Sequence, residues 1–291
     1  MHKFAYHAPS TVKEAATLLA KNGPNGRVLA GGTDLLVQIK EHVKGPPPDY
    51  VVSLKNIAEL QEVKFFARGG LTIGAGATIS AALSVPGVRE RFPGLVQGSE
   101  IIGSLQIQNI ATIGGNICNA APSADSVPPL IAYGATCSVA GPRKTREIAL
   151  EDFFAGPGKT VLQPDELLVS VNVPTPPARS GCNYERHTPR AQMDIAMVGV
   201  ASYIELGRNG KIVDARIVLG AVAPTPIRAR QAEASLRGAT PTDDAIAQAA
   251  ELAATEESPI SDVRGSAGYR RYITSVLVKR TLKAALNDAL T

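Results

Sequence analysis

The chain of 291 residues contains no tryptophan, three cysteines and four histidines. No two cysteines stand in a C-x-x-C spacing, so the sequence argues against a disulfide framework and against an iron–sulfur cluster held by this chain. The histidines are not paired at the spacing of metal ligands either, which leaves a metal site little support. Any metal or iron–sulfur chemistry would therefore have to come from a partner chain.

Aromatic residues make up only 4% of the chain, and the 30 basic side chains exceed the 26 acidic ones by a net charge of only +4. Nucleic-acid surfaces usually combine stronger positive charge with aromatic rings for stacking, so we expect no nucleic-acid partner. No run approaches the roughly 18 apolar residues of a membrane span, and MHKFAYHAPST lacks the apolar core of a signal peptide. We expect a cytoplasmic protein, and peripheral association with the inner face of the membrane stays open.

What is present is typical of a globular protein: 44% apolar and 19% charged residues, in a chain long enough for two domains. Residues 1–55 predict a small α/β unit. Thr11 and Glu14 have capping-box spacing at the start of a helix, and Asn22-Gly23-Pro24 ends it. Strands are predicted at 3–6, 28–30 and 50–54.

Residues 56–177 predict a strand-rich lobe, and residues 178–291 a domain with a sheet and three helices. Arg68-Gly69-Gly70 and Arg208-Asn209-Gly210 read as hairpin turns. The cluster Pro174-Thr175-Pro176-Pro177 is the predicted boundary, and the fold class is α+β. Further helices are predicted at 78–83, 86–102 (broken at Pro93-Gly94), 227–236, 243–255 and 269–289, and strands at 135–140, 166–173, 196–206 and 212–222. Basic residues expected to form a solvated face on the last helix, with a partner surface as the alternative, are Arg270, Arg271, Lys279, Arg280 and Lys283.

Two segments with paired glycines are the candidate binding sites. The first, Ala30-Gly31-Gly32-Thr33-Asp34, follows a predicted strand. Its bare backbone leaves N–H groups unpaired, which suits an anion such as a pyrophosphate. It is neither G-x-G-x-x-G nor a phosphate loop, so a plain tight turn remains an alternative.

The second segment, Thr112-Ile113-Gly114-Gly115-Asn116, is predicted to be a loop as well. It again offers a hydroxyl, bare backbone and an amide, and Asp125 follows nine residues on. The surrounding side chains are mostly uncharged hydrogen-bonding groups, which suits a large, already charged ligand rather than acid–base catalysis. Asp125, when ionised, can only accept hydrogen bonds, and the hydroxyls of a ribityl or ribose chain are suitable donors. We expect no catalytic side chain in this sequence.

AGGTDLL at 30–36 and TIGGNICNAAPSADSVPPL at 112–130 resemble the two flavin-binding signatures of the molybdenum hydroxylase flavoproteins. That family includes the medium subunit of bacterial carbon monoxide dehydrogenase and the FAD domain of xanthine dehydrogenase. The resemblance continues through RHTPRAQMDIAMVGVAS at 187–202, VLGAVAPTPIRARQAEASLRG at 218–238 and GSAGYRRYITSVLVKRTL at 265–282. It therefore covers essentially the whole chain.

The resemblance implies a two-lobed FAD-binding domain at 1–177 (lobes of about 1–55 and 56–177) and a C-terminal flavoprotein domain at 178–291. The two glycine segments would cradle the FAD pyrophosphate from opposite sides, and Asp125 would contact the polar chain of the cofactor. Ile102 stands where one branch has an aromatic ring against the isoalloxazine, and Ile195 where another has a mobile tyrosine. The implied cofactor-binding residues are Ala30, Gly31, Gly32, Thr33, Asp34, Leu35, Ile102, Thr112, Ile113, Gly114, Gly115, Asn116, Asp125 and Ile195, with no metal ligand.

The implied function is an FAD-carrying electron-transfer subunit that takes electrons from two [2Fe–2S] clusters in a small subunit and passes them to an external acceptor. Molybdopterin and the substrate pocket would belong to a large subunit, and the assembly would be a dimer of heterotrimers. A flavin-free scaffold subunit is the alternative. A stand-alone FAD oxidase is disfavoured by the short segment after Pro177, and a branch with a four-cysteine insertion is disfavoured by the three scattered cysteines. The substrate and the electron acceptor stay open.

Overall fold

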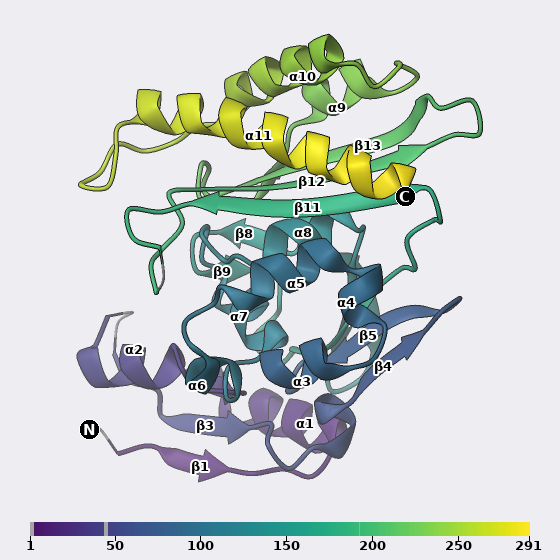
Figure 1. Ribbon diagram of the computed structural model, residues 1–291. Helices are drawn as coiled ribbons and strands as arrows, with labels where there is room; N and C mark the ends of the chain where they lie inside the picture. The colour runs from purple at the N-terminus through teal and green to yellow at the C-terminus, as the bar shows by residue number, and fades with distance from the viewer. Residues whose placement is uncertain (1–2, 44–45, 192) are drawn as a thin grey trace.

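The computed structural model describes residues 3–43, 46–191 and 193–291 and shows three β-sheets, a small hairpin and helices around them (Figure 1). The N-terminal lobe is a parallel sheet in the order β1-β3-β2. The predicted cap is confirmed, because Thr11 Oγ1 accepts a hydrogen bond from the Glu14 N–H at 3.1 Å. The elements are β1 (Ala5–His7), α1 (Val12–Asn22), β2 (Gly26–Leu29), α2 (Leu35–Glu41), β3 (Tyr50–Ser53) and η1 (Ala58–Gln61).

The second lobe is a five-stranded antiparallel sheet in the order β4-β5-β10-β6-β7, with short helices between β5 and β6. The predicted helix at 86–102 is divided at Phe92, next to Pro93. The strands are β4 (Val63–Phe66), β5 (Gly70–Gly74), β6 (Thr136–Ala140), β7 (Thr145–Ala149) and β10 (Leu167–Val173). The helices are α3 (Ile79–Ser84), α4 (Val88–Arg91), α5 (Pro93–Glu100), α6 (Leu105–Gln108), α7 (Ile113–Asn119) and α8 (Val127–Ala132); η2 (Leu150–Asp152), β8 (Phe154–Gly156) and β9 (Lys159–Thr160) lie between β7 and β10.

The C-terminal part contains the predicted sheet and three helices, and the whole chain has the predicted α+β architecture. The sheet is antiparallel in the order β11-β12-β13-β14, and its edge strand β11 falls in a segment for which the sequence predicts no strand. The elements are β11 (Ser180–His187), β12 (Val198–Leu206), β13 (Ile212–Gly220), β14 (Ile227–Arg228), α9 (Arg230–Leu236), α10 (Asp243–Thr255) and α11 (Ala267–Leu290).

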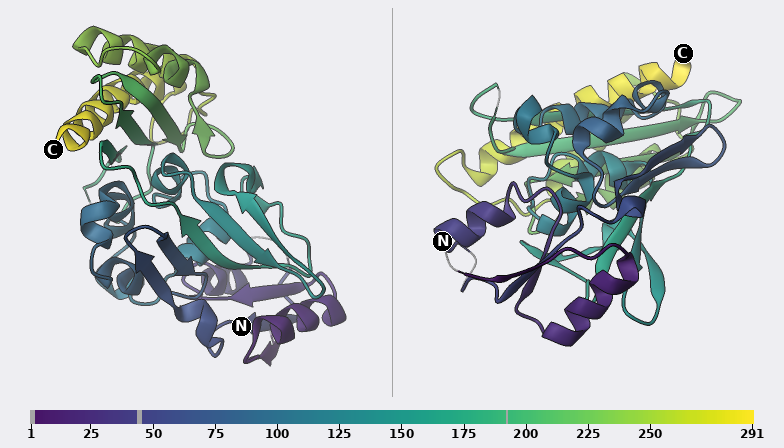
Figure 2. Two further views of the ribbon diagram at one scale, coloured as in Figure 1. Left: turned by 90° about the vertical axis from the view of Figure 1, so that its right-hand side faces the viewer. Right: turned by 90° about the horizontal axis from the view of Figure 1, so that it is seen from below.

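The C-terminal sheet is covered on both faces. Helices α9 and α11 pack on one face, while α5 and α8 of the second lobe pack on the other. Buried residues of both parts, such as Phe92, Tyr133 and Tyr203, therefore share one hydrophobic core. In the left view of Figure 2 the C-terminal module lies at the top, the five-stranded sheet in the middle and the N-terminal lobe at the bottom. No described helix is long and apolar enough to cross a membrane.

The predicted solvated face of α11 is wrong at Arg270, whose residue surface is only 2% exposed. Its guanidinium donates to the Met197 carbonyl oxygen at 2.6 Å and to Asp262 Oδ1 at 2.8 Å. A helical charge pattern cannot show this, because both acceptors come from loops that close over the helix. Arg271, Lys279 and Arg280 are exposed as expected, and Lys283 is half-buried.

Glu257 is a buried carboxyl beside α11, and it predicts a pH-dependent stability. Burial raises its pKa to about 7, although Thr274, Arg271 and Arg270 oppose the shift. Because the pKa of an unfolded glutamate is about 4.3, the folded state holds an extra proton between these values. The stability that this proton contributes is present below about pH 4.3 and is lost as the pH rises through about 7.

We therefore expect Glu257→Gln to raise the unfolding temperature relative to the wild type more at about pH 8 than at about pH 5, where the native carboxyl is already protonated. Thermal unfolding at the two pH values measures this, with the exposed Glu251→Gln on α10 as the control for removal of a charge. Equal differences at both pH values would contradict the prediction.

Candidate functional site

The first glycine segment is the turn between β2 and α2. Gly32 has φ of 77°, a left-handed conformation that favours glycine, and its carbonyl oxygen accepts the hydrogen bond from Leu36 N–H at 3.0 Å. Asp34 is the N-cap of α2, but its side chain makes no capping hydrogen bond. Among the described residues, the N–H groups of Gly32, Thr33 and Asp34 therefore have no hydrogen-bond acceptor.

The second glycine segment is not a loop, which corrects the sequence interpretation. Thr112 is the N-cap of α7, and its Oγ1 accepts a hydrogen bond from Gly115 N–H at 2.8 Å. Gly114 and Gly115 thus lie in the first helical turn. The N–H groups of Ile113 and Gly114 precede the first intrahelical hydrogen bond. The antiparallel bridge between Thr78 and Thr112 turns the Ile113 N–H toward Ala77, so of these two only the Gly114 N–H has no acceptor among the described residues. The bare backbone donors are present, but a helix terminus supplies them.

The two segments lie side by side, and the helices that follow them are joined: Gln38 Nε2 of α2 donates to Asn119 Oδ1 of α7 at 3.1 Å, across 81 residues of sequence. A Cβ at Gly31 would lie 2.9 Å from the Cα of Ala111, and one at Gly115 would lie 3.9 Å from the Cβ of Ala30. The absence of a side chain at Gly31 therefore permits the contact. The unpaired N–H groups of the first segment and the unpaired N–H of Gly114 therefore lie in neighbouring parts of the structure.

The nearly isosteric substitution Thr112→Val removes only the oxygen that caps α7. We therefore expect it to weaken the first turn of α7 and, with it, the binding of an anionic ligand by the backbone of that turn. Loss of a cap costs about 1 kcal/mol. Thr242 is a matched control, since its Oγ1 caps α10 by accepting from Ala245 N–H at 3.2 Å, far along the chain from the glycine segments. Thermal unfolding should show similar losses for Thr112→Val and Thr242→Val. FAD titration should show weaker binding only for Thr112→Val, and equal binding by both variants would contradict this.

Asp125 lies between α7 and α8 and is 6% exposed. Its Oδ1 accepts a hydrogen bond from the Tyr184 hydroxyl at 2.7 Å, and its Oδ2 accepts one from Arg186 Nη1 at 2.5 Å. Burial raises the pKa of Asp125, while the charge of Arg186 and both hydrogen bonds lower it. Each oxygen keeps a second lone pair, so the carboxylate can still accept a hydrogen bond from a ligand.

Tyr184 and Arg186 are site residues that the sequence interpretation missed. Both stand on β11, which was not predicted, and lie 59 and 61 residues from Asp125. Asn116, in contrast, was named for its free amide, but its Oδ1 accepts a hydrogen bond from Ser126 Oγ at 2.7 Å. The amide oxygen therefore ties α7 to the residue that follows Asp125.

The two isoleucines of the predicted site differ in their surroundings. Ile102 is half-buried against the core, and its carbonyl oxygen accepts a hydrogen bond from Gln108 Nε2 at 3.1 Å. Ile195, between β11 and β12, is 50% exposed. Ile102 therefore lies against the core of the second lobe, whereas Ile195 lies in an exposed connection.

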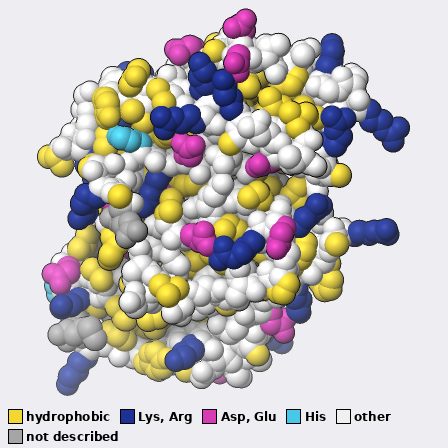
Figure 3. Space-filling view, in the orientation of Figure 1, with side chains coloured by type: hydrophobic (Ala, Val, Ile, Leu, Met, Phe, Trp, Pro, Cys, Tyr) yellow, Lys and Arg dark blue, Asp and Glu magenta, His cyan; other side chains and the backbone are white. Residues whose placement is uncertain are grey.

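Ile195 belongs to an exposed apolar patch formed by the β11–β12 connection and the chain entering α11. Figure 3 shows hydrophobic side chains gathered around a histidine at the upper left of this face. His187 Nε2 lies 3.2 Å from the Tyr269 hydroxyl and joins the two segments. The exposed apolar residues of these two segments are Met193, Ile195, Ile260, Val263, Tyr269 and Tyr272.

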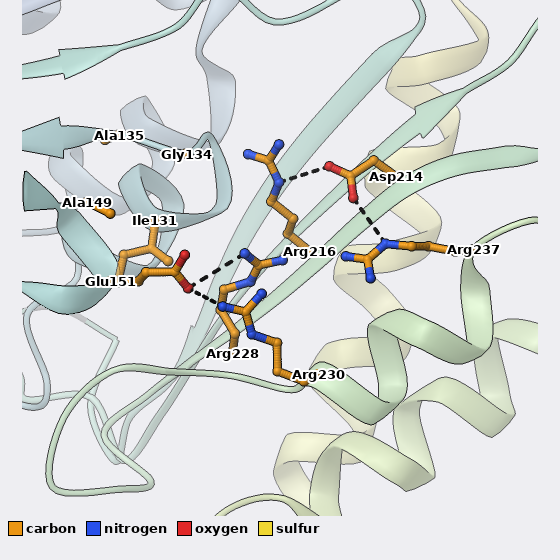
Figure 4. A pocket seen from close by; sticks show the side chains of 10 residues that line it. All are labelled: Ile131, Gly134, Ala135, Ala149, Glu151, Asp214, Arg216, Arg228, Arg230 and Arg237. Atoms are coloured by element: carbon orange, nitrogen blue, oxygen red, sulfur yellow. Dashed lines mark hydrogen bonds and ion pairs between the residues drawn. The ribbon is translucent and has the colours of Figure 1, made fainter.

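A pocket of about 380 Å³ lies away from the glycine segments, between η2 and α8 on one side and β13, β14 and α9 on the other (Figure 4). Glu151 lies within 4 Å of Arg228 and Arg230, and Asp214 within 4 Å of Arg216 and Arg237. The fully buried Glu233 also pairs with Arg228, at 2.7 Å. Three carboxylates therefore face four guanidinium groups. Since these charges nearly balance, the pocket is not a strong anion site, and we call this interface between the second lobe and the C-terminal part the seam.

Two family models match the chain. The FAD binding domain in molybdopterin dehydrogenase matches residues 2–176, and the CO dehydrogenase flavoprotein C-terminal domain matches residues 184–285. The chain is 34% identical to the xanthine dehydrogenase FAD-binding subunit of Escherichia coli O157:H7, over 99% of this chain and 98% of that one. It is 33% identical to the carbon monoxide dehydrogenase medium chain of Hydrogenophaga pseudoflava, over 97% of each chain.

The structure agrees with these similarities. A chain of carbon monoxide dehydrogenase from Hydrogenophaga pseudoflava, in a form that lacks the Mo-pyranopterin moiety, superposes with a TM-score of 0.93 and 33% identity, over 99% of this chain and 98% of that chain. The match thus extends through the FAD-binding part and the C-terminal part together. The chain belongs to the family of FAD-binding medium subunits of the molybdenum hydroxylases, a family of oxidoreductase flavoproteins.

Proposed function

We propose that this chain is the electron-transfer subunit of a molybdenum hydroxylase, which takes electrons from [2Fe–2S] clusters of a partner subunit and passes them through FAD to an external acceptor. The observation that carries the proposal is the convergence of two glycine segments in which the N–H groups of Gly32, Thr33, Asp34 and Gly114 have no acceptor within the described chain. Such paired backbone donors fit a dinucleotide pyrophosphate. When bound, FAD supplies the redox chemistry, and the protein supplies binding, orientation and electrostatics.

Each predicted residue then has a role in holding FAD. Residues from Ala30 to Leu35 and from Thr112 to Asn116 hold the pyrophosphate through backbone N–H groups and the Thr33 hydroxyl. Asp125 accepts hydrogen bonds from the hydroxyls of the cofactor's polar chain. Ile102 packs against the isoalloxazine, and Ile195 lies near its edge. These assignments rest on the family resemblance and on the geometry of the two segments.

The partners in this proposal are a molybdopterin-binding large subunit and a small subunit with two [2Fe–2S] clusters, arranged as a dimer of heterotrimers in the cytoplasm. The relatives support this because one is called a medium chain and another an FAD-binding subunit. FAD would lie between lobes of about 1–55 and 56–177, with a C-terminal domain from 178 to 291. The matched family models, which meet between residues 176 and 184, support this division.

Flavin content of the native complex tests the proposal. We expect the purified complex to show the visible absorbance of oxidised flavin, which bleaches when its substrate is added anaerobically. Gly115→Leu should lose flavin while subunit assembly, followed by size-exclusion chromatography, is retained. Gly268→Leu on α11 is the control, because nothing lies within 4 Å of a Cβ at Gly268. A wild-type complex without flavin would overturn the proposal and favour a scaffold subunit.

A further inference from the structure

The contacts of Asp125 cross from one half of the molecule to the other. Asp125 stands just before α8 in the second lobe, whereas its two donors, Tyr184 and Arg186, stand on β11 of the C-terminal sheet. The side chains of Arg186 and Asp125 are both only 8% exposed. A charged pair so deeply buried requires a partner for every charge, because an unpaired buried charge is costly.

Arg186 makes a second contact that its charge does not require. Its Nη2 donates to the carbonyl oxygen of Ile101 at 3.2 Å. Ile101 precedes Ile102, and both belong to the turn that closes α5. One planar guanidinium therefore binds the carboxylate assigned to the polar chain of FAD and the backbone next to the residue assigned to the isoalloxazine. The rigid fork of arginine suits two acceptors at fixed positions, which a lysine ammonium does not reproduce.

We propose that Arg186 is a positioning residue that sets the relative placement of the Asp125 carboxylate and the Ile101–Ile102 backbone, so that the C-terminal sheet completes the flavin site. The inference rests on the proposed function, since it needs FAD in that site. Arg186 acts through Asp125 and Ile101 and need not touch the cofactor. Tyr184 contributes by keeping the second carboxylate oxygen hydrogen-bonded, so that the carboxylate has one orientation.

The chain offers a matched control in Arg146. Its guanidinium, like that of Arg186, binds one carboxylate and one carbonyl oxygen: two nitrogens lie 2.9 and 2.7 Å from the oxygens of Glu166, and Nη2 donates to the Val161 carbonyl oxygen at 3.1 Å. This pair lies within the second lobe and shares no residue with the predicted flavin set. Arg146→Met therefore removes a bound carboxylate and a bound carbonyl, as Arg186→Met does, without touching Asp125 or Ile101.

The test compares Arg186→Met, Arg186→Lys and Arg146→Met by FAD titration, visible circular dichroism of the bound flavin, its midpoint potential and thermal unfolding. We expect Arg186→Met to weaken FAD binding by about tenfold to 100-fold and to change the flavin dichroism and potential. Arg186→Lys should recover part of the affinity, because it keeps the charge but not the two-acceptor geometry. Arg146→Met should lower the unfolding temperature and leave the flavin properties as in the wild type.

The outcomes separate this inference from the proposed function. If wild-type protein binds no FAD, the proposed function fails and the inference falls with it. If the wild type binds FAD and Arg186→Met binds it with unchanged affinity, dichroism and potential, the inference alone is overturned. If Arg186→Met is too unstable to study, Tyr184→Phe, which removes only one hydroxyl from Asp125, must still change the flavin dichroism for the inference to stand.

Discussion

Replacement of Gly31 by alanine is expected to weaken FAD binding by about 100-fold, which corresponds to about 2.8 kcal/mol of binding free energy. The added Cβ would lie 2.8 Å from the carbonyl carbon of Ile110 and 2.9 Å from the Cα of Ala111, which are backbone atoms. That backbone cannot yield easily, because Ala111 N–H donates to Ile107 and the Ala111 carbonyl accepts from Ile79 N–H. The first glycine segment would have to move away from the second.

Movement of one segment separates the backbone donors of the two segments, while each lobe keeps its own core. We therefore expect Gly31→Ala to fold, with a modest loss in unfolding temperature, and to bind FAD weakly in a fluorescence titration. Gly115→Ala should have a smaller effect, because its Cβ would meet the side-chain oxygen of Thr112, at 2.8 Å, rather than backbone. Gly268→Ala is the control in open space. Wild-type affinity in Gly31→Ala would show that this close approach is not required.

The glycine segments show how far sequence reasoning reaches. The pairing of Gly31 with Gly114 and Gly115 could be inferred, because glycine is required wherever backbones approach closely, and a short pattern carries that signal. The helical state of the second segment could not. Low helix propensity predicts a loop, but Thr112 caps the turn, and the missing side chain at Gly114 lets α7 approach Ala75, whose Cα would lie 2.6 Å from a Cβ there.

Arg186 and Arg270 show what the sequence does not carry. Both arginines are buried because acceptors from distant segments meet them: Asp125 and the Ile101 carbonyl for Arg186, and Asp262 and the Met197 carbonyl for Arg270. In sequence each reads as an exposed charge. Strand β11 was missed for a different reason, because its polar residues interrupt the apolar alternation that predicts a strand.

Glu233→Ala is expected to destabilise the C-terminal part by about 3–5 kcal/mol, because it leaves a buried arginine without its main partner. Glu233 is fully buried. Its oxygens accept hydrogen bonds from Arg228 Nε at 2.9 Å, Arg228 Nη2 at 2.7 Å and Ile217 N–H at 3.0 Å. Urea unfolding measures the loss. Arg89→Met is the control, because the Arg89–Glu100 pair is about half exposed and should be worth about 0–1 kcal/mol.

A double variant can show whether the loss of stability comes from the buried charge that is left unpaired or from the lost attraction between Arg228 and Glu233. Removal of both charges, in Arg228→Met with Glu233→Leu, leaves no unpaired ion, so we expect it to be more stable than Glu233→Ala alone. Arg228 also lies 3.6 Å from Glu151, which reaches it from η2 across the seam. If Glu151 alone were enough to pair the charge of Arg228, Glu233→Ala would lower the free energy of unfolding no more than Arg89→Met does. A double variant at least as unstable as Glu233→Ala would instead show that the pair itself, and not the stranded charge, stabilises the seam.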